Sequence, residues 1–333
     1  CAGELAVSAD SLPAASASPA PADSATPLPA ETPIDQTTET SVPEPAAQTF
    51  AGNLLVEEYA IVSASVDTPT RLEYWQHVDP RILETRRPWR EPWGEGYLAG
   101  YNAALGPFGL RIVARGDAEA RTFAIQRAEE IIYGDLNRVW RPAVREDGGD
   151  YALLVEDSAG QLLLLRQAGA AAWDPRWLPV APIFLGNSLV VVESDATGLH
   201  YTVRGGQDIL YEFELETPAV DIPVKGLWTW DGQWVLEVDG RVLVNGRHLN
   251  RELGYDEIFG WQLIAGQPFY FFRSAGQYGV SYAGSTLPLA YDEIVHGQCC
   301  EPAAFNAQGA PAMVSLHARR GDVWHYVEMG VYE

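Results

Sequence analysis

Lysine, cysteine and long apolar runs are scarce in this chain, and each shortage narrows what the protein can be. Lys225 is the only lysine among 22 basic residues, against 45 acidic ones, so the 333-residue chain carries a formal charge of −23. A field of that sign repels phosphate backbones, so nucleic acid is not an expected partner. No apolar run approaches the ~18 residues that a membrane-spanning helix requires. Any attachment to a membrane is therefore expected to use something other than a span.

The usual signatures of reactive sites are also missing. The sequence has no Gly-x-Ser-x-Gly elbow, no His-Glu-x-x-His pair, no glycine-rich phosphate loop and no calcium-binding ladder of aspartates. Its six histidines are scattered, and none lies at metal-pair spacing from another. The sequence thus predicts no cofactor, no metal and no catalytic residue, and it favours a binding function over an enzymatic one.

Two of the three cysteines are adjacent, in the stretch His296-Gly297-Gln298-Cys299-Cys300-Glu301. In an oxidising compartment, Cys299 and Cys300 could close a strained vicinal disulfide. They could instead be two reduced thiols packed under a loop, because a free cysteine behaves as a small apolar residue. A metal site formed by both thiols and His296 would need a fourth ligand from elsewhere in the fold. The sequence leaves these three interpretations open.

The third cysteine, Cys1, opens a stretch that is rich in Ala, Pro, Ser and Thr and has no Lys or Arg up to about Thr49. This composition buries too little apolar surface to offset the entropy of ordering, so residues 1–50 are predicted to be a disordered tether. An O-glycosylated stalk has the same composition as a plain linker. A leading cysteine before a polar tail resembles the mature end of bacterial lipoproteins. That resemblance implies acylation of Cys1 and an extracytoplasmic protein anchored by lipid in the cell membrane or outer membrane.

Beyond residue 50 the chain is rich in aromatic residues and strand formers, and one pattern recurs. Short strand-like runs alternate with Asp-Gly, Ala-Gly or Asn-Gly steps, which supply the positive φ that hairpin turns require. Two copies end in a Tyr-Asp-Glu-Ile tetrad, at 255–258 and at 291–294. The copies begin near Gly149, Asn187, Gly232, Gly266 and Gly309. This spacing of roughly 40 residues is typical of four-stranded propeller blades.

The sequence therefore predicts an all-β fold over residues 51–333, a β-propeller of about seven (six to eight) four-stranded blades. Closure is expected where the strand near Val56 meets the C-terminal strand at 323–327. A short helix is expected at 97–105. A pair of β-sandwich domains is the main structural rival, although sandwich strands do not repeat a tetrad at fixed spacing.

The segment Gly276-Gln277-Tyr278-Gly279-Val280-Ser281-Tyr282, with Gly284 and the run Leu287-Pro288-Leu289-Ala290-Tyr291-Asp292 after it, is similar to the WG (KWG) repeat. That repeat reads Gly-Lys-Trp-Gly-Tyr-Ile-Asp, then a glycine turn, an apolar-Pro step and Tyr-Asp. Tyr278 stands in place of the signature tryptophan, and Gln277 in place of the lysine. The resemblance implies a β-rich repeat used for interactions, with no catalytic residues.

One stretch is a candidate ligand or partner surface because three arginines alternate with two tryptophans: Arg86, Arg87, Trp89, Arg90 and Trp93. Arginine and tryptophan together can take an acidic or a sugar ligand. The alternative is a loop packed against its neighbours. The chain has eleven tryptophans in all, Trp228 among them, and most are expected to pack between blades.

The repeated acid pairs Asp256-Glu257 and Asp292-Glu293 are expected to be structural, because the same feature recurs in successive repeats. Carboxylates from different blades could still converge on a glycoside-hydrolase site. The function that fits best is a lipid-anchored extracytoplasmic β-propeller, acting as a protein–protein interaction or assembly module of the cell envelope. Its partners would be the membrane, through lipid on Cys1, and other envelope proteins. The alternative is a carbohydrate-binding protein or a propeller-type glycoside hydrolase, with a glycan as ligand.

Overall fold

The computed structural model describes residues 45–61, 78–117, 120–215, 223–298, 303 and 305–332. The chain divides into two compact units, Cys1–Ser41 and Val42–Glu333, and every described residue belongs to the second. Cys1, the adjacent pair Cys299 and Cys300, and nearly all of the predicted tether lie outside the described residues.

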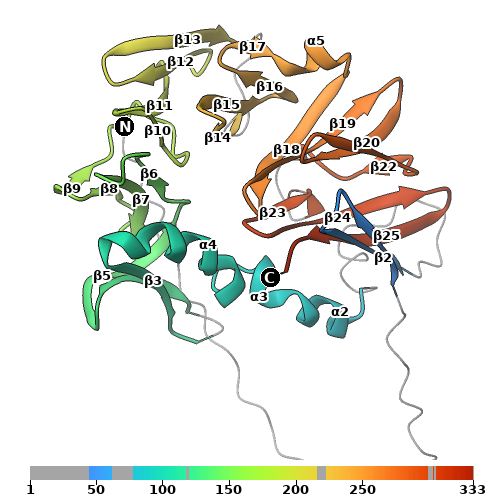
Figure 1. Cartoon of the computed structure of the whole chain (residues 1–333), viewed down its shortest axis with the longest axis horizontal. Coiled ribbons are helices and arrows are strands. Elements are labelled where there is room, and N and C mark those ends of the chain that lie inside the picture. Colours follow the sequence, from blue (N-terminus) through green and yellow to red (C-terminus); the bar gives the residue numbers. More distant parts are fainter. Residues whose placement is uncertain are drawn as a thin grey trace, which may run out of the picture. The chain divides into compact units, whose positions relative to one another are not determined.

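Three sheets are antiparallel meanders in which four strands follow one another along the chain (Figure 1). The first contains β10 (Ile183–Leu185), β11 (Ser188–Ser194), β12 (His200–Gly205) and β13 (Asp208–Glu214). The second contains β14 (Val224–Trp230), β15 (Gln233–Val238), β16 (Arg241–Val244) and β17 (Arg247–His248). The third contains β18 (Glu257–Ile264), β19 (Gln267–Ser274), β20 (Gln277–Tyr282) and β21 (Ser285–Leu289).

Two larger sheets account for the other described strands. The seven-stranded sheet contains β3 (Leu110–Arg115), β4 (Thr122–Arg127), β5 (Glu130–Val139), β6 (Ala143–Val144), β7 (Tyr151–Asp157), β8 (Leu162–Arg166) and β9 (Gly169–Ala172). The six-stranded sheet contains β1 (Ala46–Phe50), β2 (Leu54–Ile61), β22 (Glu293–Ile294), β23 (Gln308–Ala310), β24 (Met313–Arg320) and β25 (Val323–Gly330). The predominance of antiparallel strands confirms the predicted β class, whereas the propeller and its blade number stay predictions.

The described helices are few and short: α2 (Pro80–Thr85), α3 (Arg87–Arg90), α4 (Glu95–Leu105), the 3₁₀ turn η1 (Gly106–Phe108) and α5 (Leu249–Leu253). Helix α4 confirms the helix expected at 97–105. The alternative to a ligand surface for the stretch from Arg86 to Trp93 is a packed loop. The structure has the short helix α3 there instead. Pro88 lies in the first turn of α3, where the missing N–H of a proline is no loss.

The turns have the backbone conformation that their sequence predicts. Between β14 and β15, Asp231 has φ 50° and Gly232 has φ 67°. Between β18 and β19, Ala265 has φ 48° and Gly266 has φ 73°. Two consecutive positive φ values are the mark of a type I′ turn, whose twist matches the flanking strands. The glycine steps read from the sequence therefore mark real hairpins.

The strand that contains Val56 pairs with the last described strand, as predicted. Strand β2 is antiparallel to β25, with Tyr59 opposite Tyr326. Strand β1 adds to the outside of β2 and pairs Ala46 with Glu58. The fold thus begins before residue 51, earlier than the predicted boundary. Four of the five residues of β1 are exposed, so its hydrogen bonds to β2, and not an apolar pattern, hold it in place.

Several hydrophobic clusters lie between sheets that are neighbours in the chain. Val235 and Val242, from β15 and β16, pack with Ile258 and Trp261 of β18. All four are at most 3% exposed, and burial of each stabilises the fold by roughly 1.5–3 kcal/mol. A single sheet could not bury these apolar faces alone. Neighbouring sheets bury them against each other, and this is the packing that the sequence repeat predicts.

Candidate functional site

A cavity in the described part of the chain has a volume of about 700 Å³ and is lined by residues of four of the five sheets and by the segment that leads into the fifth. Its walls come from α4, the end of β5 and the loop after it, the segment before β10, and strands β14, β18 and β23. A volume of this size suits a small-molecule ligand. The cavity is therefore the candidate functional site.

Helix α4 contributes two tyrosines to one wall. Tyr97 and Tyr101 are four residues apart and thus share one face of the helix, while Leu98 and Leu105 are buried in the core. The two rings meet edge to face with centroids 5.6 Å apart, and their hydroxyls share a hydrogen bond. Burial raises the pKa of both tyrosines, so both remain neutral hydroxyls at neutral pH.

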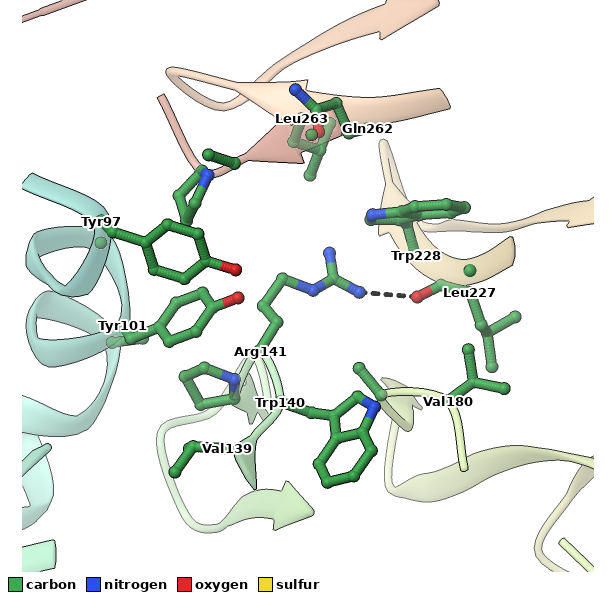
Figure 2. Close-up of a pocket in the computed structure, with 18 of the residues that line it drawn as sticks. Tyr97, Tyr101, Val139, Trp140, Arg141, Val180, Leu227, Trp228, Gln262 and Leu263 are labelled. Atoms are coloured by element: carbon green, nitrogen blue, oxygen red, sulfur yellow. Dashed lines mark hydrogen bonds between the residues drawn. The ribbon is translucent and has the colours of Figure 1, made fainter. Parts of the chain in front are cut away.

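Arg141 enters the cavity from the loop after β5. Its neighbour Trp140 is 8% exposed, packs in the core between two sheets, and donates its backbone N–H to the carbonyl of Leu154 at 3.0 Å. This anchor fixes the backbone from which the arginine side chain extends. Figure 2 shows the guanidinium reaching across the cavity, between the two tyrosine hydroxyls and the indole of Trp228.

The Arg141 guanidinium has a carbonyl partner but no carboxylate among the described residues. Its Nη2 donates to the carbonyl oxygen of Leu227 in β14 at 2.6 Å, and its Cζ lies 5.8 Å from the ring of Trp228. Burial lowers the pKa of Arg141 to about 10, so the side chain remains a cation at neutral pH. A desolvated cation without a counter-charge is rare in folded proteins, because burying it is costly.

The wall opposite α4 is held by a chain of contacts behind it. Trp228 packs against Trp261 with ring centroids 4.8 Å apart. The backbone N–H groups of Gly260 and Trp261 donate to the two carboxylate oxygens of buried Glu237, at 3.0 and 2.7 Å. Next in the chain, the Gln262 side chain lines the cavity and donates to the carbonyl of Met313 at 3.2 Å. The β-bulge of β18 at this point thus has a fixed geometry.

The charge of the cavity is opposite to that of the chain. Three of the described residues that line it are basic, namely Arg138, Arg141 and Lys225, and none is Asp or Glu. Arg138 lies over the ring of Trp140, with its Cζ 4.4 Å from the ring centroid. In a chain with twice as many acidic as basic residues, this lining favours an anionic ligand.

The surface predicted from sequence lies elsewhere, and its side chains contact other parts of the protein. Arg86 pairs with Glu57 at 2.8 Å, and Arg90 pairs with fully buried Glu328 at 3.1 Å. Arg87 forms ion pairs with Glu84 and Glu91, which lie three and four positions from it in the sequence. The ring of Trp89 meets Tyr332 edge to face, and that of Trp93 stacks on Phe123. These contacts fit the packed alternative stated for this stretch.

The two tetrads have matching intrachain contacts. The backbone N–H of Asp256 donates to the carbonyl of Arg273, and that of Asp292 donates to the carbonyl of Arg319, each at 2.8 Å. The following glutamate in each copy forms an ion pair with the same arginine. Repeated acid pairs of this kind join strands, in agreement with the structural role predicted for them.

Within the described residues, no group of three or more His, Cys, Asp or Glu side chains could hold a metal ion. The same residues contain no helix that is long and apolar enough to span a membrane. The His296 ring stacks on Phe259 with centroids 3.7 Å apart, and its Nε2 lies 3.1 Å from Glu257.

Sequence reasoning did not find Arg141, Tyr97 or Tyr101 as site residues. Two signals were present: tyrosines at i and i+4 on the expected helix, and an arginine between Trp140 and Pro142. Neither signal shows that these residues face Trp228, which lies 87 positions after Arg141 and 131 after Tyr97, because only the tertiary fold brings them together.

No protein-family model matches this chain, and no curated protein matches it in sequence. Among solved structures, it is similar to BBS1N in complex with ARL6DN, soaked with lead, at 14% identity and a TM-score of 0.31, over 66% of this chain and 75% of that one. The mercury-soaked crystal of the same complex is similar at 13% identity and a TM-score of 0.30, over 66% of this chain and 74% of that one. A subtype N10 neuraminidase-like protein of A/little yellow-shouldered bat/Guatemala is similar at 9% identity and a TM-score of 0.28, over 60% of this chain and 95% of that one.

Proposed function

We propose that this protein is a lipid-anchored, extracytoplasmic binding module of the cell envelope, built as a β-propeller, and that the cavity is its recognition site. The observation that carries the proposal is the lining of the cavity. Four of the five sheets, and the segment that leads into the fifth, line one space of about 700 Å³ that contains a cation without a carboxylate partner among the described residues, beside aromatic side chains. Concave sites with a few convergent polar groups are where proteins usually bind ligands.

Binding has more support than hydrolysis. Glycoside hydrolysis of the common kind needs a pair of carboxylic acids on either side of the scissile bond. None of the described residues that line the cavity is an acid. A carbohydrate-binding protein therefore fits the lining better than a propeller-type glycoside hydrolase does, and an assembly module would receive a side chain or chain end of its partner in the same space.

The lipid anchor on Cys1 is the part of the proposal that the resemblance to bacterial lipoproteins suggests. Two or three acyl chains at one residue make membrane attachment stable where a single chain leaves it marginal. Mass spectrometry of the N-terminal peptide from native membranes checks this part: we expect acylated Cys1, and a bare thiol would refute the anchor.

Two neighbouring alanines of α4 allow a matched test of the recognition site. Ala104 lines the cavity, whereas Ala103 is exposed and does not line it. In Ala104→Phe the added ring projects into the cavity, and in Ala103→Phe it projects into solvent. The wild-type protein and both variants would be purified from solubilised envelopes, and bound molecules identified by native mass spectrometry.

We expect the same molecule or partner to be retained by the wild type and by Ala103→Phe and to be lost from Ala104→Phe. Thermal unfolding of each variant shows that the fold is intact. Equal retention by all three proteins would mean that the cavity is not the recognition site.

A further inference from the structure

We propose that the cavity binds the carboxylate of a small acidic sugar, with Arg141 as the residue that recognises it. This inference rests on the proposed role of the cavity and names the chemical class of its ligand.

The first argument is the pairing of the half-buried arginines. Arg86 and Arg90, which also approach the core, each have a carboxylate of the chain within 3.1 Å. Arg141 has the carbonyl of Leu227 instead, and no described carboxylate pairs with it. A guanidinium carries five N–H donors in a planar fork that matches a carboxylate. One donor of Arg141 is used at Leu227, which leaves the others available to a ligand in the cavity (Figure 2).

The second argument distinguishes a carboxylate from a phosphate. Of the other two cations in the lining, Arg138 lies against the face of Trp140, and Lys225 interacts electrostatically with the carboxyl group of Glu237. A phosphate dianion would therefore meet mainly one free fork, inside a protein of net charge −23. A monoanion needs one counter-charge and is repelled less by that field. The charge in the cavity thus suits a carboxylate better.

The third argument concerns the rest of the ligand. The cavity presents ring faces or edges from Trp228, Tyr97 and Tyr101, and flat aromatic surfaces suit the apolar faces of a sugar ring. The neutral tyrosine hydroxyls and the amide of Gln262 can exchange hydrogen bonds with sugar hydroxyls. A hexuronic acid combines a pyranose ring with one carboxylate, and a cavity of about 700 Å³ accommodates it.

A matched pair of ligands tests the inference. Methyl β-D-glucuronide and methyl β-D-glucoside differ only at C6, where one has a carboxylate and the other a hydroxymethyl group. Isothermal titration of the full chain with each should give a dissociation constant roughly tenfold or more lower for the glucuronide, the size expected of a charge-assisted contact. Glucose 6-phosphate, as a dianion, should bind more weakly than the glucuronide.

Variants assign the effect to Arg141. In Arg141→Gln the preference for the glucuronide should vanish, and in Arg141→Lys, which keeps the charge but not the fork, it should be reduced. Arg247→Gln is the control, because Arg247 is exposed, pairs with Glu252 at 3.1 Å and does not line the cavity. Unchanged affinity in the control, with unchanged melting temperatures in all variants, separates recognition from a loss of folding.

Three results would overturn the inference: equal binding of glucuronide and glucoside, tighter binding of the phosphate, or a preference that survives Arg141→Gln. Absence of binding by the whole series would overturn it too. In that case the retention experiment with Ala104→Phe still decides, independently, whether the cavity is a recognition site.

Discussion

Arg90 and Arg141 are both half-buried, but they differ in what they face. Arg90 donates to Glu328 and to the hydroxyl of Tyr326, both at 3.1 Å, and Glu328 is completely buried. Arg141 faces a cavity and has no described carboxylate to neutralise. The first arginine therefore belongs to the framework of the fold, and the second belongs to the site.

The two arginines should respond differently to replacement by methionine. Arg90→Met leaves the buried carboxylate of Glu328 without its counter-charge and should lower the free energy of unfolding by about 3–5 kcal/mol. Arg141→Met removes a costly desolvated charge but also the donor to Leu227, so the change should stay within about 1 kcal/mol. Urea unfolding of both variants measures the difference. If Arg141→Met is as destabilising as Arg90→Met, Arg141 is a structural tie and not a ligand residue.

Glu237, which supports the cavity wall from behind, makes stability depend on pH. Burial raises its pKa to about 7, although the N–H groups of Gly260 and Trp261 favour the charged form. The folded state therefore keeps the proton at pH values where the unfolded chain has lost it. Stability from this group is fully present below about pH 4.5 and is lost as pH rises through about 7.

Glu237→Gln should remove that dependence. Urea unfolding of the wild type and the variant at pH 4.5 and pH 8 isolates the contribution of this residue, because other titrating groups are common to both proteins. Relative to the variant, the wild type should lose roughly 2–3 kcal/mol between the two pH values. A constant difference between the two proteins would mean that the pKa of Glu237 is not raised.

At the scale of elements, the hairpin turns are the features most directly written in the sequence. Ala275 and Gly276 join β19 to β20 with φ values of 48° and 78°, a conformation that alanine tolerates poorly. Asn-Gly is the preferred pair for such a turn. The turn at Asn245-Gly246 already has it, and there the Asn245 side chain also accepts the backbone N–H of Trp234 at 3.0 Å.

Ala275→Asn should therefore stabilise the protein by roughly 0.5–1 kcal/mol, because asparagine reaches positive φ at lower cost. Ala275 is exposed, so the larger side chain meets no packing barrier. Thermal unfolding should show a higher melting temperature than for the wild type. A lower melting temperature would mean that this turn is not limited by the conformation of Ala275.

Local signals predicted local structure well and tertiary arrangement poorly. Glycine steps and alternating patterns identified β7, β8, β11, β12, β15 and β19, because turn geometry and strand propensity depend on nearby residues. They missed β1, whose side chains are mostly exposed, and α3, which lies between residues that read as a loop. No local signal shows that β3 to β9 share one sheet.

At the scale of the whole molecule, the site exists only because separate sheets converge on it. Arg141 lies in the loop after β5, and Trp228 lies on β14 of another sheet. Tyr97 lies on α4, which precedes both in the sequence. Each of these residues is unremarkable in its own segment. Charge at this scale was also misleading, since a strongly acidic chain surrounds a cavity whose described lining has no acid.

A crystal structure of the full chain with methyl β-D-glucuronide tests the central claim most directly. The account predicts that the sugar occupies the cavity, with its carboxylate within hydrogen-bond distance of the Arg141 guanidinium and its ring beside Trp228. A sugar bound only on the outer surface, or a carboxylate directed away from Arg141 inside the cavity, would contradict it.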